Sequence, residues 1–233
     1  VNTHPLFTKR AVKTRLYVVI TSNRGLAGAY NANIMRLLAR SVLKDREEHI
    51  KSRVVAIGKQ GANFVRRLEG VELVAAYSAF SDHPTANELR PVLNMVVEMY
   101  QTEAVDDVKL LYTKFKSNIV QEAKRLAILP TRFEPEEGEA PDQGQDLGDV
   151  TFEPSVTSVL DNVAVRLIEV QIWQAMLESI ASEHSMRMLA MKNATDNASE
   201  LIDDLTLEFN TARQAAITQE LAEITGGAEA IQQ

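Results

Sequence analysis

Two glycine-containing turns carry the residues whose types and spacing come nearest to a phosphate-binding site. The first, residues 21–31 (TSNRGLAGAYN), follows an apolar run and precedes an amphipathic segment, which is where a doubly wound fold binds nucleotides. A dinucleotide loop needs G-x-G-x-x-G, and a phosphate loop needs a lysine followed by serine or threonine after its last glycine. This turn has only Gly25 and Gly28, and the second turn, residues 57–61 (IGKQG), has two glycines and one lysine. Both patterns therefore indicate tight strand-to-helix turns, and we expect no cofactor.

Side chains that could bind a metal or act in catalysis form no recognisable constellation in this sequence. The chain has no cysteine, which excludes a thiolate metal site and a cysteine nucleophile. The four histidines, which show no metal-ligand spacing, are His4, His49, His83 and His184. Ser81, Asp82 and His83 are consecutive, but adjacency does not give the mutual geometry of a catalytic triad. We expect no catalytic residue, no metal and no enzymatic activity in the chain itself.

The far end of the chain has an unusual mixture of hydrogen-bonding residues and alanines. The polar residues are Asn210, Thr211, Arg213, Gln214, Thr218, Gln219 and Glu220, and the alanines among them are Ala212, Ala215 and Ala216. Small residues let two helices approach closely, while the polar groups could form directional hydrogen bonds with a surrounding protein surface. An ordinary solvated helix face fits the same spacing. The residue types alone leave these two interpretations open.

These residues belong to a stretch, residues 155–225, that contains neither glycine nor proline. A helix of that length would run roughly 100 Å at about 1.5 Å per residue. Apolar residues recur in it at a period near 3.5 residues, which is typical of a left-handed coiled coil. The first core position carries Val156, Val163, Val170, Leu177, His184, Met191, Ala198, Leu205, Ala212 and Gln219, and the second carries Val159, Arg166, Trp173, Ile180, Arg187, Ala194, Leu201, Glu208, Ala215 and Ala222. This stripe predicts a partner helix, either in a second copy of the chain or in a segment outside this sequence.

The rest of the sequence alternates between short apolar runs and amphipathic segments. We expect strands at residues 16–21, 53–57, 71–77 and 108–115, and helices at residues 31–48, around 64–68 and at 85–103, while residues 120–129 fit either a strand or a helix. This alternation predicts the α/β class, with a Rossmann-like, mostly parallel sheet and helices on both of its faces. The expected domains are a globular domain (residues 1–132), an acidic linker (133–154) and a long helix (155–233).

The acidic residues of the chain are concentrated in the expected linker. The formal charge is −7, and between residues 134 and 149 there are seven carboxylates without one lysine or arginine. The remainder is close to neutral, so we expect no nucleic-acid partner. The composition, with 45% hydrophobic and 24% charged residues, is that of a folded globular chain. No apolar run of about 18 residues is present, so we expect no membrane-spanning helix.

Several of these segments together resemble the family of F-type ATP synthase gamma subunits. The resemblance rests on TSNRGLAGAYN (residues 21–31), AIGKQG (56–61), F-E-P (152–154) and, most specifically, RMLAMKNATDNASELIDDLTLEFNTARQAAITQELAEITGGAEAI (187–231). It covers essentially the whole chain and implies a non-catalytic rotor shaft with a Rossmann-like domain at its foot. In that family the long helix forms an antiparallel coiled coil with an N-terminal helix, which is missing from this sequence. The resemblance thus implies the partner of the long helix.

The resemblance also implies a function, partners and a location. A shaft of this kind couples ion-driven rotation of a membrane c-ring to conformational change at catalytic sites on other chains, and so to ATP synthesis. The implied partners are three alpha and three beta subunits, the epsilon subunit and the c-ring, with no nucleic acid and no small-molecule substrate. The implied location is the periphery of a membrane, on the cytoplasmic side of a bacterial plasma membrane or the equivalent organellar face.

Individual site residues are implied by matching position in the family. Arg213, Gln214, Thr218 and Glu220 look like residues that contact the catch loops of the surrounding catalytic subunits. Phe152 and Glu153 look like part of the foot near the c-ring, although family members often carry tyrosine where Phe152 stands. Two other classes of protein fit parts of the sequence: a homodimeric coiled-coil adaptor, and a nucleotide-dependent α/β enzyme with a coiled-coil tail.

Overall fold

The structure is a computed structural model that describes residues 5–80, 83–131 and 156–231. It divides into two compact units, Val1–Arg187 and Met188–Gln233, which are described separately. The boundary between these units lies inside the long helix. The acidic linker, residues 133–154, lies outside the described residues.

The first unit is built on a five-stranded sheet with the order β3-β2-β1-β4-β5. Its strands are β1 (Thr14–Ile20), β2 (Lys51–Ile57), β3 (Val71–Tyr77), β4 (Asp107–Phe115) and β5 (Gln121–Leu129). Neighbouring strands from β3 to β4 are parallel, and β5 is antiparallel to β4. The prediction of a mostly parallel sheet is therefore confirmed, and the segment that fitted either a strand or a helix is an edge strand.

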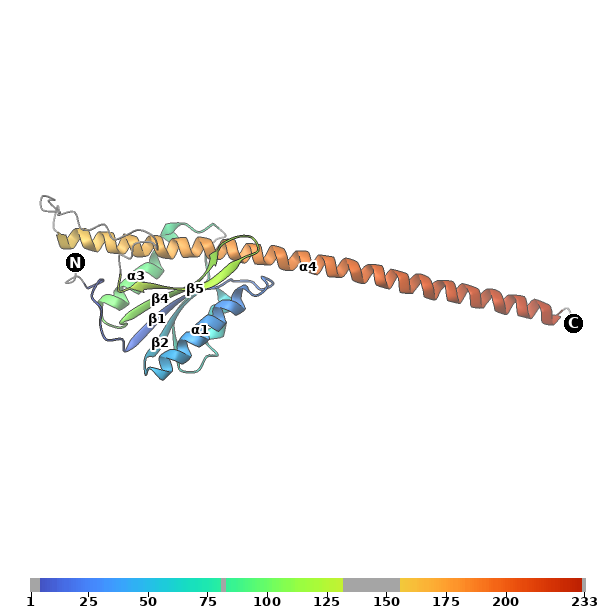
Figure 1. Ribbon diagram of the computed structural model, residues 1–233, viewed down its shortest axis with the longest axis horizontal. Coiled ribbons are helices and arrows are strands. Elements are labelled where there is room, and N and C mark those ends of the chain that lie inside the picture. The colour runs from blue at the N-terminus through green and yellow to red at the C-terminus, as the bar shows by residue number, and fades with distance from the viewer. Residues whose placement is uncertain (1–4, 81–82, 132–155, 232–233) are drawn as a thin grey trace. The chain divides into compact units, whose positions relative to one another are not determined.

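Helices cover both faces of this sheet, as predicted (Figure 1). The helices are α1 (Tyr30–Glu47), α2 (Lys59–Val65), a 3-10 turn η1 (Ala86–Leu89), α3 (Arg90–Gln101) and α4 (Val156–Ile231). One core joins Tyr17 and Val19 of β1 to Ile34 and Leu38 of α1. The opposite core joins alternate residues of the same strand to α3 and to the first part of α4. This alternation is the period of two that a strand buried on both faces requires.

The helix expected over residues 85–103 is divided into η1 and α3. Thr85 and Glu88 form a capping box at the start of η1, and α3 then begins at Arg90 with Pro91 in its first turn. Proline has no backbone N–H and is tolerated only where a helix has no use for that donor. Pro91 therefore marks the start of a new helix and does not lie inside a longer one.

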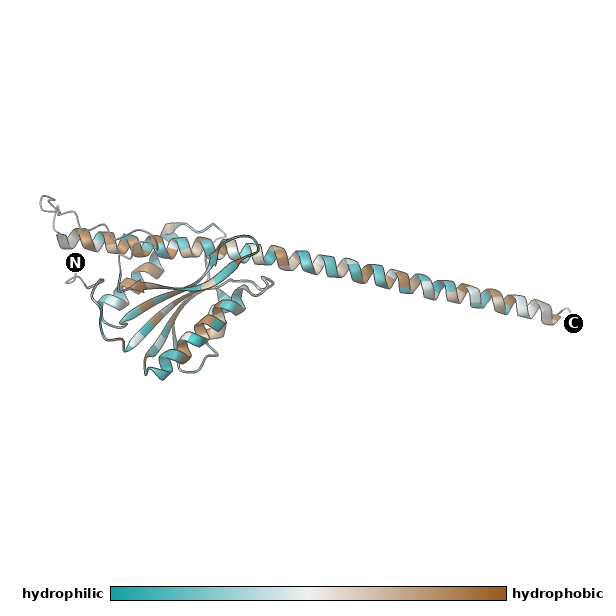
Figure 2. Ribbon diagram, viewed as in Figure 1, coloured by the Kyte–Doolittle hydropathy of each residue, from teal (hydrophilic) through white to brown (hydrophobic). Residues whose placement is uncertain are grey.

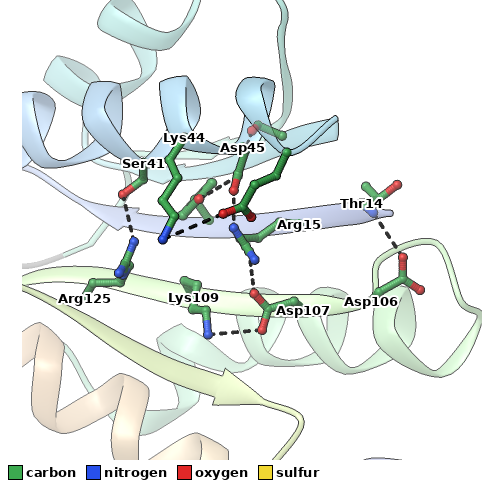
Figure 3. A network of polar contacts seen from close by, with 12 residues as sticks. Thr14, Arg15, Ser41, Lys44, Asp45, Asp106, Asp107, Lys109 and Arg125 are labelled. Carbon is green, nitrogen blue, oxygen red and sulfur yellow. Dashed lines mark hydrogen bonds and ion pairs between the residues drawn. The ribbon is translucent and has the colours of Figure 1, made fainter. Parts of the chain in front are cut away.

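A buried polar network holds the C-terminal end of α1 against the sheet (Figure 3). Asp45 has no exposed surface, and it accepts hydrogen bonds from the Tyr17 hydroxyl at 2.6 Å and from the Ser52 hydroxyl at 3.0 Å. Arg15 pairs with both Asp45 and Asp107. Burial, with the hydrogen bond to Asp45, raises the pKa of Tyr17 above its ordinary value. Each buried charge in the network thus has a partner of opposite sign, as a stable interior demands.

The second unit is a single helical segment that continues α4 to Ile231. Nearly all of its described side chains are exposed, including many large apolar ones. Figure 2 shows hydrophobic residues recurring along this segment among hydrophilic ones. The large apolar side chains exposed here include Met188, Met191, Leu201, Ile202, Leu205, Leu207, Phe209, Ile217, Leu221 and Ile224.

Candidate interaction surfaces

The turn after β1 uses its polar groups to bind the start of α2. The first three backbone N–H groups of that helix donate to Asn23 Oδ1 at 3.1 Å, to the Ser22 carbonyl at 3.1 Å and to Thr21 Oγ1 at 2.9 Å. A phosphate bound at a helix N-terminus needs just these donors. The α2 N–H groups that could bind a phosphate are therefore already hydrogen-bonded to the turn after β1.

The glycines of the second turn allow this close contact. A Cβ atom on Gly58 would lie 2.2 Å from the Thr21 carbonyl oxygen, and one on Gly61 would lie 2.8 Å from Thr21 Oγ1. Gly58 also has a φ of 96°, a conformation that residues with a side chain rarely adopt. The interpretation of this turn as a tight strand-to-helix connection agrees with the geometry.

The turn after β1 also contacts α4 at the end of the first unit. The Arg187 guanidinium donates to the Gly25 carbonyl at 3.4 Å and pairs with Glu183 at 2.7 Å. A cavity of about 190 Å³ lies beside it, lined by Thr21, Arg24, Tyr30, Glu183, His184 and Arg187 among others. Arg187 thus joins the turn after β1 to Glu183 of α4.

In the first unit α4 has two apolar faces, of which one packs on the sheet. Ala164, Ile168, Ile172 and Ala175 are at most 2% exposed and belong to the core under the sheet. Further along this face, Ser179 Oγ accepts a hydrogen bond from the Thr113 N–H at 3.1 Å. The residues are spaced by three and four, as one stripe of a helix requires.

Four residues of the predicted coiled-coil stripe lie on another face of α4 and are exposed, whereas Ile180 of the same stripe is partly buried and packs against the core under the sheet. Val163 is 45% exposed, Val170 44%, Trp173 37% and Leu177 41%. We call these four residues the seam. Because the sheet uses a different set of side chains, the seam is free to take a second helix. The heptad pattern alone did not reveal that the sheet-facing stripe existed beside it.

Near the end of the second unit, the four predicted contact residues are all exposed. They are Arg213, Gln214, Thr218 and Glu220. At about 100° per residue, Arg213 and Glu220 lie on one line of the helix and Gln214 and Thr218 on a neighbouring one. Ile217, Leu221 and Ile224 project between these lines. The structure thus brings the four residues onto one mixed polar and apolar side, which we call the distal face; Ala212, Ala215 and Gln219 lie opposite.

Polar groups on the distal face are not used within the helix. Thr211 and Thr225 donate their hydroxyls to carbonyls four residues earlier, at 2.9 and 2.7 Å. In contrast, among the described residues no hydrogen bond or ion pair involves the side chains of Arg213, Gln214, Thr218 or Glu220. Their donors and acceptors are available to another surface.

Some of the residues singled out in the sequence lie outside the part of the chain that the structure describes. Phe152 and Glu153, the residues of the expected foot, lie outside the described residues, as do Ser81 and Asp82. Across the described ranges, no cluster of three or more histidine or acidic residues could hold a metal ion. No helix in the same ranges is long and apolar enough to cross a bilayer.

Comparisons with known proteins agree with the resemblance noted in the sequence. The ATP synthase family model matches residues 1–231. The ATP synthase gamma chain of Moorella thermoacetica is 43% identical over 229 residues, which cover 98% of this chain and 77% of that relative. The corresponding chain of Staphylococcus carnosus is 39% identical over 232 residues, with 98% and 78% covered.

Solved structures support the fold. A chain in the mitochondrial ATP synthase of Euglena gracilis, in a structure of its OSCP, F1 and c-ring, is similar with a TM-score of 0.68 and 21% identity, covering 94% of this chain and 73% of that one. A chain in the central stalk and c-ring structure from Tetrahymena thermophila gives a TM-score of 0.62 with 22% identity, covering 81% and 79%. The sheet with a long C-terminal helix is therefore an arrangement shared with chains of ATP synthase structures.

Proposed function

The chain belongs to the ATP synthase gamma-chain family, and on this premise we propose that it is the central rotor shaft of an F-type ATP synthase. In this role it couples ion-driven rotation of a membrane c-ring to conformational change at catalytic sites on other subunits. The observation that carries the proposal is the 43% identity to a gamma chain over 98% of the sequence. A helical segment whose apolar side chains are exposed suits this role, because a shaft must be surrounded by other chains to be stable.

In this proposal the chain is a non-catalytic subunit. The amides that would bind a phosphate at the start of α2 are already bonded to Thr21, Ser22 and Asn23. This use of the amides counts against the alternative of a nucleotide-dependent enzyme. Its contribution to ATP synthesis is mechanical: an asymmetric shaft shifts each catalytic site among its states by contacting those states differently.

The seam is the proposed contact for an N-terminal helix, in an antiparallel coiled coil. Val163, Val170, Trp173 and Leu177 recur with heptad spacing and are not needed by the sheet. The matched region covers only 77% of the Moorella relative, so the relatives contain further chain that could supply a helix. A homodimeric adaptor, the alternative partner arrangement, would cover the same seam with a second copy.

The distal face is the proposed contact for the catch loops of the catalytic subunits. Guanidinium, amide, hydroxyl and carboxylate groups make directional hydrogen bonds that can be exchanged as a shaft turns. Arg213, Gln214, Thr218 and Glu220 are exposed and do not use these groups within the described chain. Their grouping around Ile217 and Leu221 adds an apolar centre to the contact.

The wider assembly follows from the same proposal. The partners are three alpha and three beta subunits, the epsilon subunit and the c-ring, with Phe152 and Glu153 in the foot near that ring. The chain is placed at the periphery of the membrane, on the cytoplasmic side in a bacterium or on the equivalent organellar face. An intact-complex mass of material purified in mild detergent tests this composition. One copy of the chain with three alpha-like and three beta-like subunits is expected, whereas a homodimer alone would favour the adaptor.

A double substitution tests the role of the distal face. We expect Arg213→Ala combined with Gln214→Ala to lower coupled ATP synthesis by the assembled enzyme, because both side chains donate hydrogen bonds that exist only in the assembly. The free energy of unfolding of the isolated chain should change by less than about 0.5 kcal/mol, since both residues are exposed.

A matched control removes two exposed polar side chains of the same helix that belong neither to the distal face nor to the core positions of the heptad. Replacing Glu200 and Asp203 by alanine should leave ATP synthesis close to that of the unchanged enzyme. Equal rates of synthesis in the control and in the Arg213, Gln214 variant would remove the distal face from the mechanism.

A further inference from the structure

The sheet has a free edge at β5, and this edge borders a groove. β5 pairs only with β4, so one side of its backbone has no strand beside it among the described residues. Proteins usually protect such an edge, because its unpaired N–H and C=O groups can take an additional strand. The groove has a volume of about 510 Å³, and four consecutive β5 residues, Arg125 to Ile128, line it.

The contacts of β4 determine which β5 groups point outward. Thr113 and Phe115 direct their N–H groups to Ser179 and Glu178 of α4, away from β5. Their alternate neighbours must therefore bond to β5, so that pairs such as Tyr112 with Lys124 exchange hydrogen bonds. The N–H and C=O groups of Arg125 and Ala127 consequently face the groove.

The opposite wall of the groove is polar and incompletely bonded. It is formed by Gln171, Gln174 and Glu178 of α4, together with Tyr112 and Thr131. Thr131 is only 5% exposed, and its hydroxyl has no hydrogen-bond partner in the described part of the chain.

Charge and shape suggest what the occupant is. Arg125 is exposed, and its one contact in the described residues is a long one, 3.5 Å, to the Ser41 hydroxyl. On the other side of the strand, Leu126 and Ala175 give the groove an apolar floor beside the polar wall. Outward backbone groups, an available cation and an apolar floor together match an extended polypeptide better than a compact small molecule.

We propose that this groove binds an extended segment of another subunit, which adds to the free edge of β5 as a sixth strand. The segment carries an aspartate or glutamate opposite Arg125. Its two flanking residues face α4 and are apolar or bear hydroxyls that reach Tyr112 and Gln174. The inference rests on the proposed function, since it names one mode of contact between this chain and the rest of the assembly.

A second copy of the chain is a poor occupant of the same edge. Antiparallel pairing of two β5 strands centred on Arg125 would place Arg125 opposite its own counterpart. Like charges directly opposite each other destabilise a strand pair. An acidic segment of a different chain removes that repulsion and gives Arg125 a partner.

Amide hydrogen exchange in the complete ATP synthase and in the isolated chain tests the proposal. We expect the Arg125 and Ala127 amides to exchange at least about 100-fold more slowly in the assembly, because a new strand would accept their hydrogen bonds. Ala127→Pro removes one outward N–H without touching the ladder to β4, and should abolish the protection at Arg125. Arg125→Glu leaves the backbone unchanged and should do the same by repulsion, while Arg66→Glu, a change at the exposed C-cap of α2, should have no effect.

Cross-linking identifies the occupant in the same preparation. The chain has no cysteine, so Gln174→Cys provides a single thiol for benzophenone maleimide before reassembly. A cross-link to an acid-containing segment of another subunit is expected. A cross-link to a second copy, or to other residues of the same chain, overturns the proposal.

Co-purification of the other subunits tests the proposed function separately. A preparation that contains those subunits, but in which Arg125 and Ala127 exchange as fast as in the isolated chain, overturns this inference alone.

Discussion

The two halves of α4 are similarly rich in apolar residues but differ in what covers them. Before Met188, Ile168 and Ile172 are at most 1% exposed, because the sheet packs against them. After it, Leu201 and Leu205 are 58% and 54% exposed. The first half is stabilised by its own domain, whereas the second is a helix without tertiary contacts in the described chain. Most helical stability in proteins comes from such packing, so the second half depends on other chains.

The two parts of α4 therefore contain residues with two different roles. The sheet-facing stripe of the first half specifies the fold of this chain, and substitutions there should act on the isolated protein. The seam and the distal face are the proposed contacts with partners, so substitutions there should act only in the assembly. Comparing similar substitutions in the first unit and in the exposed part of α4 therefore tests whether only the first unit stabilises the isolated chain.

The largest expected effect comes from the buried network of the first unit. Asp45→Ala would leave Arg15 without one of its two carboxylates and would remove the acceptor for Tyr17 and Ser52. Breaking a buried ion pair costs about 3–5 kcal/mol, which urea unfolding of the isolated chain can measure. Asp204→Ala in the exposed half should cost less than about 0.5 kcal/mol. Similar losses in both variants would mean that the network contributes no more than a surface charge.

A slightly smaller loss of stability is expected when a buried apolar residue of α4 is replaced, and almost none when an exposed one is. Ile172→Ala should destabilise the isolated chain by about 2–5 kcal/mol, because it opens a cavity between α4 and the sheet. Leu205→Ala should change the free energy of unfolding by less than about 0.5 kcal/mol, since that side chain is already exposed. A large cost at Leu205 in the isolated chain would contradict the division, because it would require packing that the second half lacks.

Alkaline pH should lower the free energy of unfolding of the first unit and leave the second unit unchanged. Burial and the hydrogen bond to Asp45 raise the pKa of Tyr17 in the folded chain. The protonated Tyr17 hydroxyl therefore stabilises the fold fully below the unfolded pKa of 10.0, and this contribution is lost as the pH rises above 10.0. The slope is at most about 1.4 kcal/mol per pH unit for one such group.

Urea unfolding at a series of pH values above neutrality measures that slope. Tyr17→Phe should reduce the loss of stability above about pH 10. The residues after Arg187 include no tyrosine and serve as the internal comparison. An unchanged slope in Tyr17→Phe would show that other groups cause the alkaline loss.

The smallest effect on the isolated chain is expected at the seam. Val170→Ser should cost less than about 0.5 kcal/mol there, because Val170 is 44% exposed. In the assembly the same change should weaken the coiled coil. Trp173 is the single tryptophan and lies on the seam, so its fluorescence should move to shorter wavelength when a partner helix covers it. Emission that is identical in the isolated chain and in the assembly would argue against coverage of the seam.

Much of the fold could be predicted from local patterns. Residues 71–77 form the strand that their apolar run indicates, and α1 begins within one residue of its expected start. The segment over residues 120–129 could not be assigned, because its mixture of alanines, charges and apolar residues has no clear period. Pairing with β4 decides its conformation, and a pairing between strands is not visible in a single segment.

The candidate surfaces were predictable to different degrees. The family resemblance pointed to Arg213, Gln214, Thr218 and Glu220, and the helix places them on one side. The groove beside β5 had no signal in the sequence, because Arg125 and Gln171 are far apart in the chain and come together only through the fold. Likewise, the heptad analysis found one stripe of α4 and missed the second, whose spacing of three and four overlaps with it.

Gly226 and Gly227 make the end of α4 easier to unwind than the rest of the described helix, which contains no other glycine. Apart from the adjacent residues and the nearby backbone of the helix itself, no described atom lies within 4 Å of a Cβ placed on either glycine, so close packing does not require them. Glycine lowers helix stability by about 0.8–1.0 kcal/mol relative to alanine at each position. The turn that contains these glycines should therefore unwind more readily than the glycine-free turns of the second unit before it.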